Sequence, residues 1–340
     1  MSVYSIAVDL GGTNLRIAAV SSEGKLLDKL TTGTEVQRGR DYVIGEMCDA
    51  IQSLEAKHRS AGDLAGIGIG VPGFIDMDTG TIMRSPNLQD WARFPVRQEI
   101  ERRLGTKVIL ENDANAAALG EKWLGAGRNT EHMAMYTLGT GVGGGIVMNG
   151  RLWHGVNGMA GELGHITVEP EGHPCGCGSR GCLEQYASAT AIVRMAREAL
   201  ESGNAPDLAD AAQGNVEFTS RAIYQLAVQG HPSAQKIYRR VGCALAIGIG
   251  GMVNALNLPM YVIGGGVASA WDAFAPAMFE EMKVRSFIYS ITAPDRVGPG
   301  EKHTVVTIAL LGSDAGLYGA ACLPLLAPVA QTETVRSLAP

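Results

Sequence analysis

Three cysteines and a histidine lie close together in the middle of the chain. Cys175, Cys177 and Cys182 fall within eight residues, and His165 precedes them. Three thiolates and one imidazole complete a tetrahedral Zn²⁺ site with no open position, so such a site is structural. Free thiols and a disulfide are the alternatives, and a reducing compartment disfavours the disulfide. The C-x-C spacing departs from the common C-x2-C pattern, and His173 is a rival ligand.

Two glutamates flank this cysteine-rich segment. Isolated acidic residues are usually just exposed, so neither Glu162 nor Glu184 indicates a site alone. Carboxylates and amides, however, recognise sugar hydroxyls by accepting and donating hydrogen bonds in fixed directions. Asn87, Asn112 and His165 could join the two glutamates in such a set. His165 is suited to hold the metal with one ring nitrogen and a hydroxyl with the other.

Asn112 and Asp113 stand where an apolar segment meets an Ala-rich one. Either residue could simply cap the amides of a helix. Alternatively, Asp113 accepts the proton of an attacking sugar hydroxyl, as the base does in phosphoryl transfer. We expect the helix N-terminus to keep this carboxylate ionised.

Glycine-rich turns follow two apolar segments. Asp9 precedes Gly11, Gly12 and Thr13, and a second turn occupies residues 139–145. A carboxylate beside turn amides can hold hydrated Mg²⁺ while the amides face phosphate. An ordinary glycine hairpin is the alternative for the first turn. The second has five glycines, more than a hairpin needs, which favours paired phosphate turns. The first turn is neither a dinucleotide fingerprint, because a strand rather than a helix is predicted after it, nor a P-loop, because no G-x-x-x-x-G-K-[ST] occurs.

The elements that must position these residues form an α/β pattern. Strands are predicted at 4–9, 15–20, 66–71, 107–110, 133–138, 145–148, 261–263 and near 305, and helices at 42–59, 96–104, 113–124, across most of 187–256 and at 314–325. Residues 72–86 read as a loop. The similar openings of the two half-chains suggest a duplicated α/β unit with nucleotide held between the copies. We expect a small lobe of residues 1–115, onto which the last helix packs back, and a large lobe of residues 116–313 with a helical insertion, separated by a cleft.

Composition narrows the functional classes. Of the 340 residues, 46% are hydrophobic and 18% charged, which suits a globular protein. A net charge of −6 argues against nucleic acid as a partner. The start of the chain does not resemble a signal peptide, so we expect a cytoplasmic protein. The most apolar stretch, residues 243–253, is too short to span a membrane and predicts a buried helix, whose Gly248, Gly250 and Gly251 allow close packing.

The motifs, taken in order, resemble the ROK family (repressors, open reading frames and sugar kinases) over nearly the whole chain. They read DLGGTNLR from Asp9, GVPGFID from Gly70, PNL from Pro86, LENDANAAA from Leu110, TLGTGVGGG from Thr137, GELGH from Gly161, CGCGSRGCLEQYAS from Cys175 and IGGGVA from Ile263. The resemblance implies the actin-like ATPase (ribonuclease H-like) fold with two α/β lobes. CLEQYAS is most similar to the glucokinase branch, which implies ATP-dependent phosphorylation of glucose and a homodimer or homotetramer.

The resemblance also implies roles for individual residues. Asp113 would be the catalytic base, with Asn112, Glu162, His165 and Glu184 as sugar ligands and Gly73 and Asn87 lining the same pocket. Phosphate would meet Gly11, Gly12, Thr13, Thr140 and Gly141, with Gly265 near the nucleoside and Asp9 near Mg²⁺. Zinc would be held by His165, Cys175, Cys177 and Cys182.

Other functions remain open on the sequence. Sugar-responsive repressors of the same family carry a DNA-binding module before this domain, and the first strand here starts too early to leave room for one. A kinase for mannose, fructose, N-acetylmannosamine or N-acetylglucosamine differs only in pocket shape. An actin-like assembly protein would have no use for the cysteine-rich segment. Polyphosphate could replace ATP as the donor.

Overall fold

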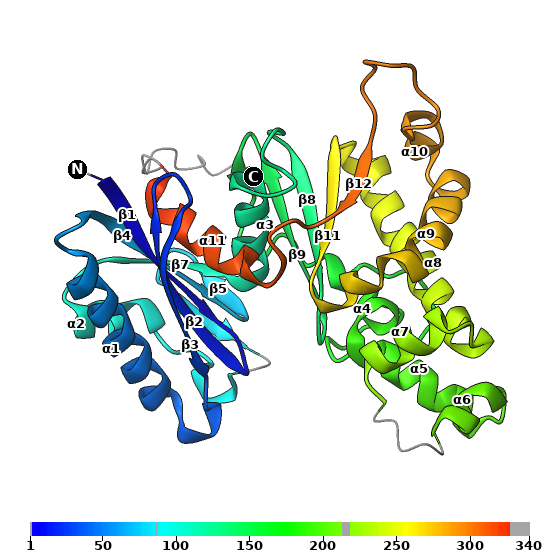
Figure 1. Cartoon of the computed structure of the whole chain (residues 1–340), viewed down its shortest axis with the longest axis horizontal. Coiled ribbons are helices and arrows are strands. Elements are labelled where there is room, and N and C mark those ends of the chain that lie inside the picture. Colours follow the sequence, from blue (N-terminus) through cyan, green and yellow to red (C-terminus); the bar gives the residue numbers. More distant parts are fainter. Residues whose placement is uncertain (1, 86–87, 213–217, 327–340) are drawn as a thin grey trace, which may run out of the picture.

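The computed structural model describes residues 2–85, 88–212 and 218–326. Two lobes, each built on a five-stranded sheet, lie side by side (Figure 1). The prediction of a two-lobed α/β protein is therefore confirmed. Asn87 and the tail after Leu326 lie outside the described residues.

The first sheet has the strand order β3-β2-β1-β4-β7. Its strands are β1 (Ser2–Leu10), β2 (Asn14–Ser21), β3 (Leu26–Gly33), β4 (Gly62–Val71) and β7 (Val108–Asn112). The first three pair antiparallel, whereas β4 and β7 run parallel to β1. Alternation along β1 explains why the sheet is covered on both faces: Ile6 and Val8 pack in a cluster with α1 (Arg40–His58) and α2 (Val96–Leu104), and Ala7 packs against α11 (Ala315–Cys322).

The second sheet repeats this plan, with the order β10-β9-β8-β11-β12. Its strands are β8 (Met133–Leu138), β9 (Val142–Met148), β10 (Arg151–Leu152), β11 (Met260–Gly264) and β12 (Val305–Ile308). Again the first three strands in sequence are antiparallel and the last two are parallel to the first. The duplication predicted from the glycine turns is thus confirmed. Asn149 and Gly150 both have positive φ, as the tight hairpin turn between β9 and β10 requires.

Most helices belong to the second lobe and lie to the right in Figure 1. They are α4 (Glu184–Ala187), α5 (Ala189–Glu201), α6 (Pro206–Ala212), α7 (Ser220–Val228), α8 (Pro232–Leu256), α9 (Trp271–Arg285) and α10 (Phe287–Thr292). Helix α3 (Asp113–Trp123) lies between the two sheets, in the middle of the same view. Short 3-10 turns are η1 (Val36–Arg38), η2 (Gln89–Trp91), η3 (Leu163–His165), η4 (Gly266–Ala270), η5 (Gly312–Asp314) and η6 (Leu323–Leu325).

Helix α8 is the predicted buried apolar helix. A Cβ added to Gly248 would lie 3.1 Å from Leu183, and one on Gly250 3.2 Å from Ser286, so both glycines do permit close packing. The prediction is wrong for Gly251, which lies on the exposed face and where an added Cβ would meet nothing within 4 Å. Within the described ranges, no helix has the length and apolar character needed to cross a bilayer.

Two further sequence predictions are wrong. Residues 72–86 do not form a plain loop, because β5 (Phe74–Asp76) and β6 (Thr81–Arg84) pair as a small antiparallel sheet. These strands are too short to show an apolar alternation. The sequence pattern also missed β3, whose side chains are mostly exposed and therefore show no apolar periodicity.

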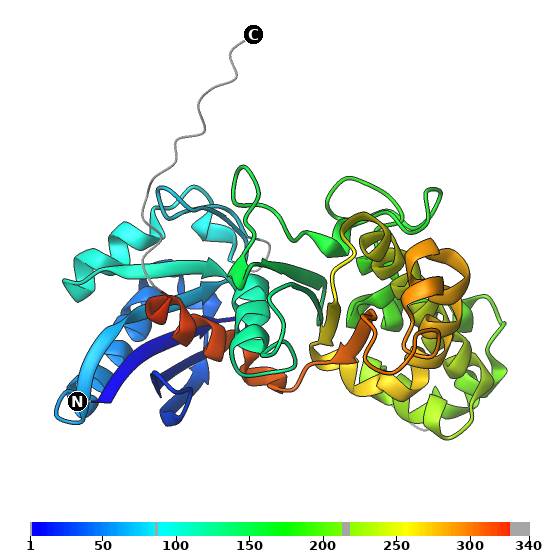
Figure 2. The ribbon, with the colours of Figure 1, turned by 90° about the horizontal axis from the view of Figure 1, so that it is seen from above.

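Two helices join the lobes where the chain crosses between them. Figures 1 and 2 both place α11 beside α3. The contact is made backbone to backbone, because a Cβ on Gly120 would lie 2.1 Å from the carbonyl oxygen of Ala315, and one on Gly319 only 1.6 Å from that of Ala116. Small residues are therefore required at this crossing.

This crossing gives a first testable prediction. We expect Gly319→Ala to lower the free energy of unfolding by about 2 kcal/mol or more, since an overpacked methyl group costs roughly 1–3 kcal/mol. Gly251→Ala is the matched control, because it also replaces a helical glycine but meets no neighbour; it should be neutral or raise stability by up to about 1 kcal/mol. Denaturant unfolding measures both, and equal effects of the two variants would contradict the prediction.

Candidate active site

The junction of β7 and α3 carries Asn112 and Asp113. Asn112 is the N-cap: its Oδ1 accepts hydrogen bonds from the backbone N–H groups of Ala114 (2.9 Å) and Asn115 (3.1 Å). Its Nδ2 donates to the carbonyl oxygen of Gly73 and to Oδ1 of Asp113, both at 3.1 Å. The capping alternative therefore holds for Asn112, whose carboxamide is already engaged on both sides.

Asp113 has an unusual electrostatic environment. Its side chain keeps partial contact with solvent. The protein packed around it nevertheless raises the pKa of this carboxyl to about 7, and the negative charges of Asp9 and Glu162 add to that effect, whereas the N–H of Ala114 opposes it. The expectation that the helix N-terminus keeps Asp113 fully ionised is therefore wrong, because burial and like charges outweigh the helix amides. A carboxyl with a pKa near neutrality is well matched to accept a proton.

Asp9 lies near the end of β1, directly before the first predicted phosphate turn on the small lobe. It is 6% exposed, and its Oδ2 lies 2.7 Å from Nη2 of Arg16. Burial raises the pKa of Asp9, although the charge of Arg16 opposes the shift. The turn that follows is held in place by a hydrogen bond, which the Thr34 hydroxyl donates to the carbonyl oxygen of Gly11 at 2.7 Å.

The turn at residues 139–141 lies against the predicted sugar ligands. Oε2 of Glu184 accepts the backbone N–H of Val142 at 3.0 Å. A Cβ on Gly141 would lie 2.4 Å from the same oxygen, so glycine is needed there. The Thr190 hydroxyl, at the start of α5, donates to the carbonyl oxygen of Thr140 at 2.8 Å. Glu184, a predicted sugar ligand, therefore lies directly against the second predicted phosphate turn.

The excess of glycines after this turn has a different cause from the one inferred from sequence. Gly143, Gly144 and Gly145 belong to β9 rather than to the turn. Added Cβ atoms would lie 2.9 Å from Ala114 at Gly143, 2.6 Å from the carbonyl oxygen of Gly161 at Gly144 and 2.7 Å from Ala118 at Gly145. These glycines let α3 and the segment before Glu162 pack on the strand, so their number is no sign of phosphate binding.

Gly265, predicted to lie near the nucleoside, is beside the turn at residues 139–141. Its φ is +85°, and an added Cβ would be 2.5 Å from the carbonyl oxygen of Leu138, directly before the turn. The structure thus brings Gly265 and its IGGGVA motif to the second predicted phosphate turn. Gly73, with φ of +119°, is likewise required, because a Cβ there would lie 2.4 Å from the carbonyl oxygen of Arg84.

The three cysteines and His165 form one compact cluster. Their ligand atoms all lie within 4.8 Å of one another. Sγ of Cys177 and Sγ of Cys182 are 3.7 Å apart, and so are Sγ of Cys175 and Nδ1 of His165. Metal–ligand bonds of about 2.3 Å to sulfur and 2.0–2.1 Å to nitrogen give tetrahedron edges of about 3.6–3.8 Å. The donor set therefore fits tetrahedral zinc, and the sulfur separation is too long for a disulfide.

His165 faces two ways, as expected. Its Nδ1 points to the cysteines, while its Nε2 lies 3.8 Å from Oε2 of Glu162. His173 is outside the cluster, because its Nδ1 is 2.9 Å from the carbonyl oxygen of Pro174. Glu162 is 44% exposed, so it remains open to an incoming ligand.

Three polar residues of this region escaped prediction from the sequence. Glu111 is 2% exposed and lies 2.7 Å from Nε2 of His154. Ser85 is 7% exposed and packs beside Gly73, and its hydroxyl has no hydrogen-bond partner among the described residues. An acidic residue within the apolar segment before Asn112 could have been noticed in the sequence, whereas nothing there singles out His154 or Ser85.

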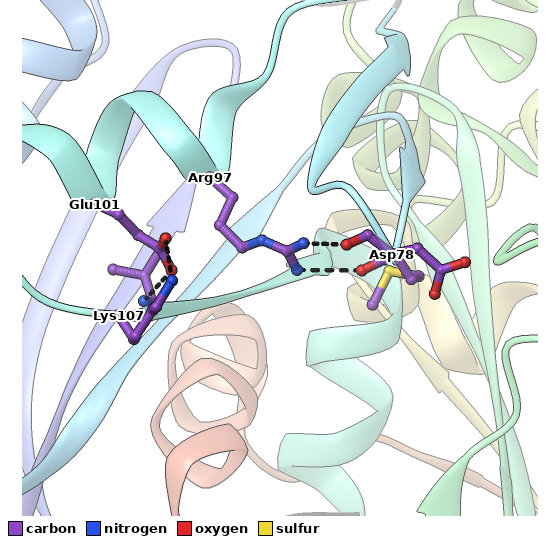
Figure 3. A pocket seen from close by; sticks show the side chains of 6 residues that line it. Asp78, Arg97, Glu101 and Lys107 are labelled. Carbon is purple, nitrogen blue, oxygen red and sulfur yellow. Dashed lines mark hydrogen bonds and ion pairs between the residues drawn. The ribbon is translucent and has the colours of Figure 1, made fainter. Parts of the chain in front are cut away.

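Two cavities lie away from Asp9, Asp113 and Glu162. One of about 760 Å³ opens beside Thr140 between α5 and the start of α7, with apolar Val193 and Phe218 and charged Arg197 in its lining. A second, of about 400 Å³, lies on the small lobe (Figure 3). Three of its charged side chains are already engaged: Lys107 Nζ lies 3.1 Å from Oε2 of Glu101, and the guanidinium of Arg97 donates to backbone carbonyl oxygens.

Comparison with known proteins identifies the family to which the chain is similar. Residues 5–325 match the ROK family. Proteins named glucokinase from Halalkalibacterium halodurans and Thermotoga maritima are each 41% identical to the chain, over 93% of both sequences in the first case and over 94% of the chain and 96% of the relative in the second. A ROK family glucokinase from Streptomyces griseus, solved in complex with glucose and AMPPNP, is 33% identical, covers 94% of this chain and 98% of its own, and superposes with a TM-score of 0.75.

Proposed function

The chain belongs to the ROK family, and from that premise we propose that it is an ATP-dependent glucokinase that converts glucose to glucose 6-phosphate. The observation that carries the proposal is the place of Asp113 at the junction of β7 and α3, where burial and the charges of Asp9 and Glu162 raise its pKa to about 7. Glucokinase relatives at 41% identity support glucose as the substrate. The actin-like fold of two duplicated α/β lobes is the one that these relatives imply.

In the proposed reaction, Asp113 accepts the proton of the C6 hydroxyl while the hydroxyl oxygen attacks the γ-phosphorus of ATP and ADP leaves. Glu162, His165 and Glu184 hold the other hydroxyls, with Gly73, Asn87 and Asn112 lining the same pocket. Since the carboxamide of Asn112 is occupied, its main contribution is to fix Asp113. Bound Mg²⁺ near Asp9 would supply positive charge to the phosphates.

We propose that the two glycine-rich turns bind the phosphates of the nucleotide and that the larger cavity binds its adenosine. Amides of Gly11, Gly12, Thr13, Thr140 and Gly141 would face phosphate oxygens. The cavity of about 760 Å³ beside Thr140 has room for the adenosine, with Phe218 offering an apolar surface and η4, which follows Gly265, in contact with α7. This is a more specific location than Gly265 alone.

We further propose that the cluster of His165, Cys175, Cys177 and Cys182 holds one structural Zn²⁺. Because His165 would contribute Nδ1 to the metal and Nε2 to the side of Glu162, the metal would fix the sugar pocket without taking part in the reaction. The lobe boundaries at residues 115 and 313, a homodimer or homotetramer and a cytoplasmic location stay predictions.

The direct test of the proposed function is a coupled assay for ADP release with glucose, run beside an assay for glucose 6-phosphate. ATP and inorganic polyphosphate are compared as donors at equal phosphoryl concentration. Stoichiometric ADP and glucose 6-phosphate support the proposal. ADP release that is independent of sugar would contradict it.

Sugar preference is a second testable prediction. We expect glucose to give a kcat/KM at least about tenfold above those of mannose, fructose, N-acetylmannosamine and N-acetylglucosamine, because rejecting one added or misplaced group is worth roughly 1–3 kcal/mol. The same assay with each sugar, at saturating ATP, measures it. An N-acetylated hexosamine that outperforms glucose would show that the pocket accommodates the acetamido group and that the chain is a different kinase of the family.

A further inference from the structure

A buried carboxylate on one lobe meets a histidine from the other directly behind the proposed base. Glu111 lies on β7 of the first sheet and is 2% exposed, whereas His154 follows β10 of the second sheet. Nε2 of His154 is 2.7 Å from Oε2 of Glu111. The hydrogen bond to Glu111 raises the pKa of His154 although burial opposes the shift. Breaking a buried ion pair leaves an uncompensated charge, which is strongly destabilising. The contact with His154 therefore contributes to the stability of the folded protein by keeping the buried charge of Glu111 paired.

The second oxygen of Glu111 is bound to the strand-to-helix junction. Its Oε1 accepts the backbone N–H of Asn112 at 2.9 Å and the side-chain amide of Asn115 at 3.1 Å. Asn112 in turn caps α3 and donates to Oδ1 of Asp113. Glu111 is therefore linked to the proposed base through one residue, Asn112, by two successive hydrogen bonds.

His154 and Glu162 are at the two ends of one short segment of the chain. The N–H of Ala160 donates to the carbonyl oxygen of His154 at 3.1 Å, which closes the segment into a compact loop. The loop also lies against the first lobe, since a Cβ on Gly158 would be 3.0 Å from the carbonyl oxygen of Ile75 in β5. Gly161 then packs on the backbone of Gly144. The position of His154 is thus tied to that of Glu162.

We propose that Glu111 and His154 form an interlobe positioning pair, which sets Asn112 and Asp113 relative to Glu162 and so aligns the reacting hydroxyl with the base. The effect of the pair on catalysis rests on the proposed function, whereas the contact between Glu111 and His154 does not. Both residues act through their neighbours, and a displacement of about 1 Å in such a site can cost about 10²-fold in rate. The pair also joins the two lobes at the point where the sugar would bind.

Three variants test the pair. His154→Leu removes the hydrogen-bond donor at similar volume, His154→Gln keeps a donor, and Glu111→Gln keeps an acceptor for Asn112 but removes the charge. We expect His154→Leu to lower kcat/KM for glucose by about 10²-fold, mainly through kcat, with the KM for ATP changed by less than about threefold. His154→Gln should recover at least about tenfold of that loss. Lys283→Ala, which breaks the surface pair with Asp295, is the control and should stay within about twofold.

A thermal-unfolding cycle of His154→Leu, Glu111→Gln and the double variant tests the pair without any assay of catalysis. Strong non-additivity in Tm supports the contact, and simple additivity overturns it. If the wild type fails to phosphorylate glucose, the proposed function fails while the unfolding cycle still judges the contact. An active wild type with His154→Leu within about threefold in kcat/KM, or equal losses in the Leu and Gln variants, would overturn the positioning role.

Discussion

Asp113→Asn is expected to lower turnover by about 10²- to 10⁴-fold while glucose still binds within a few-fold of the wild type. Asparagine keeps the shape and most of the hydrogen bonding of Asp113, but it cannot accept the proton. General-base catalysis is typically worth that factor, or roughly 3–5 kcal/mol of barrier. The measurements are kcat for glucose phosphorylation and calorimetric glucose binding.

A purely structural Asp113 predicts a different result, since asparagine caps a helix about as well as aspartate. The cap of α3 is in any case supplied by Asn112. A folded Asp113→Asn protein with kcat within about threefold of the wild type would therefore mean that another group takes the proton. Because burial raises the pKa of Asp113, its charged form is destabilising above the ordinary carboxyl pKa. The variant should accordingly unfold no more easily than the wild type at pH 8.

The pH profile offers a further check on the same residue. A base must be deprotonated to act, so kcat/KM for glucose should fall by about tenfold per pH unit below the pKa of Asp113, which is about 7 in the free protein. Asp113→Asn should lose this acidic limb and keep a low, flat activity. A wild-type limb that persists unchanged in the variant would assign the titration to a different group.

Local features of this protein could be predicted from its sequence because their signals are local. The turns after β1 and β8 are marked by glycines that interrupt apolar segments, and Asn149 and Gly150 are residue types that tolerate the positive φ of their hairpin turn. The cysteine cluster was visible because its sulfur ligands are close in the sequence. The junction at Asn112 and Asp113 was marked by polar residues between an apolar strand and an Ala-rich helix.

What the sequence missed depends on contacts between distant segments. The pKa of Asp113 is set by surrounding protein and by Asp9 on another strand, so helix position alone gave the wrong direction. The pair of Glu111 and His154 joins two lobes and has no sequence spacing that could reveal it. Gly143 in β9 looked like part of a phosphate turn because the sequence does not show that Ala114 of α3 packs on it.

Loss of the proposed zinc is expected to have the second large effect. We predict one tightly bound zinc per chain, and we expect Cys177→Ser to lose it, to raise the KM for glucose by about tenfold or more and to lower Tm. Removing only a hydrogen-bond partner of a metal ligand can cost about 10- to 100-fold in metal affinity, so removal of a ligand should cost at least as much. Cys177 is exposed, so serine creates no cavity there, and any loss can be attributed to the metal. Elemental analysis, glucose kinetics and thermal unfolding measure the three effects.

The control and the chelation experiment separate the metal from the thiol. Cys243→Ser replaces a half-buried cysteine on α8 and should keep one zinc and the wild-type KM. Chelation of the wild type should reproduce the Cys177→Ser defect, because without the metal His165 is held only by its weaker contacts with Cys175 and Glu162. Added zinc should then restore the chelated wild type but not the variant. Purified protein without zinc, or a zinc-free variant with unchanged glucose affinity and Tm, would show that the cluster does not support the sugar site through a metal.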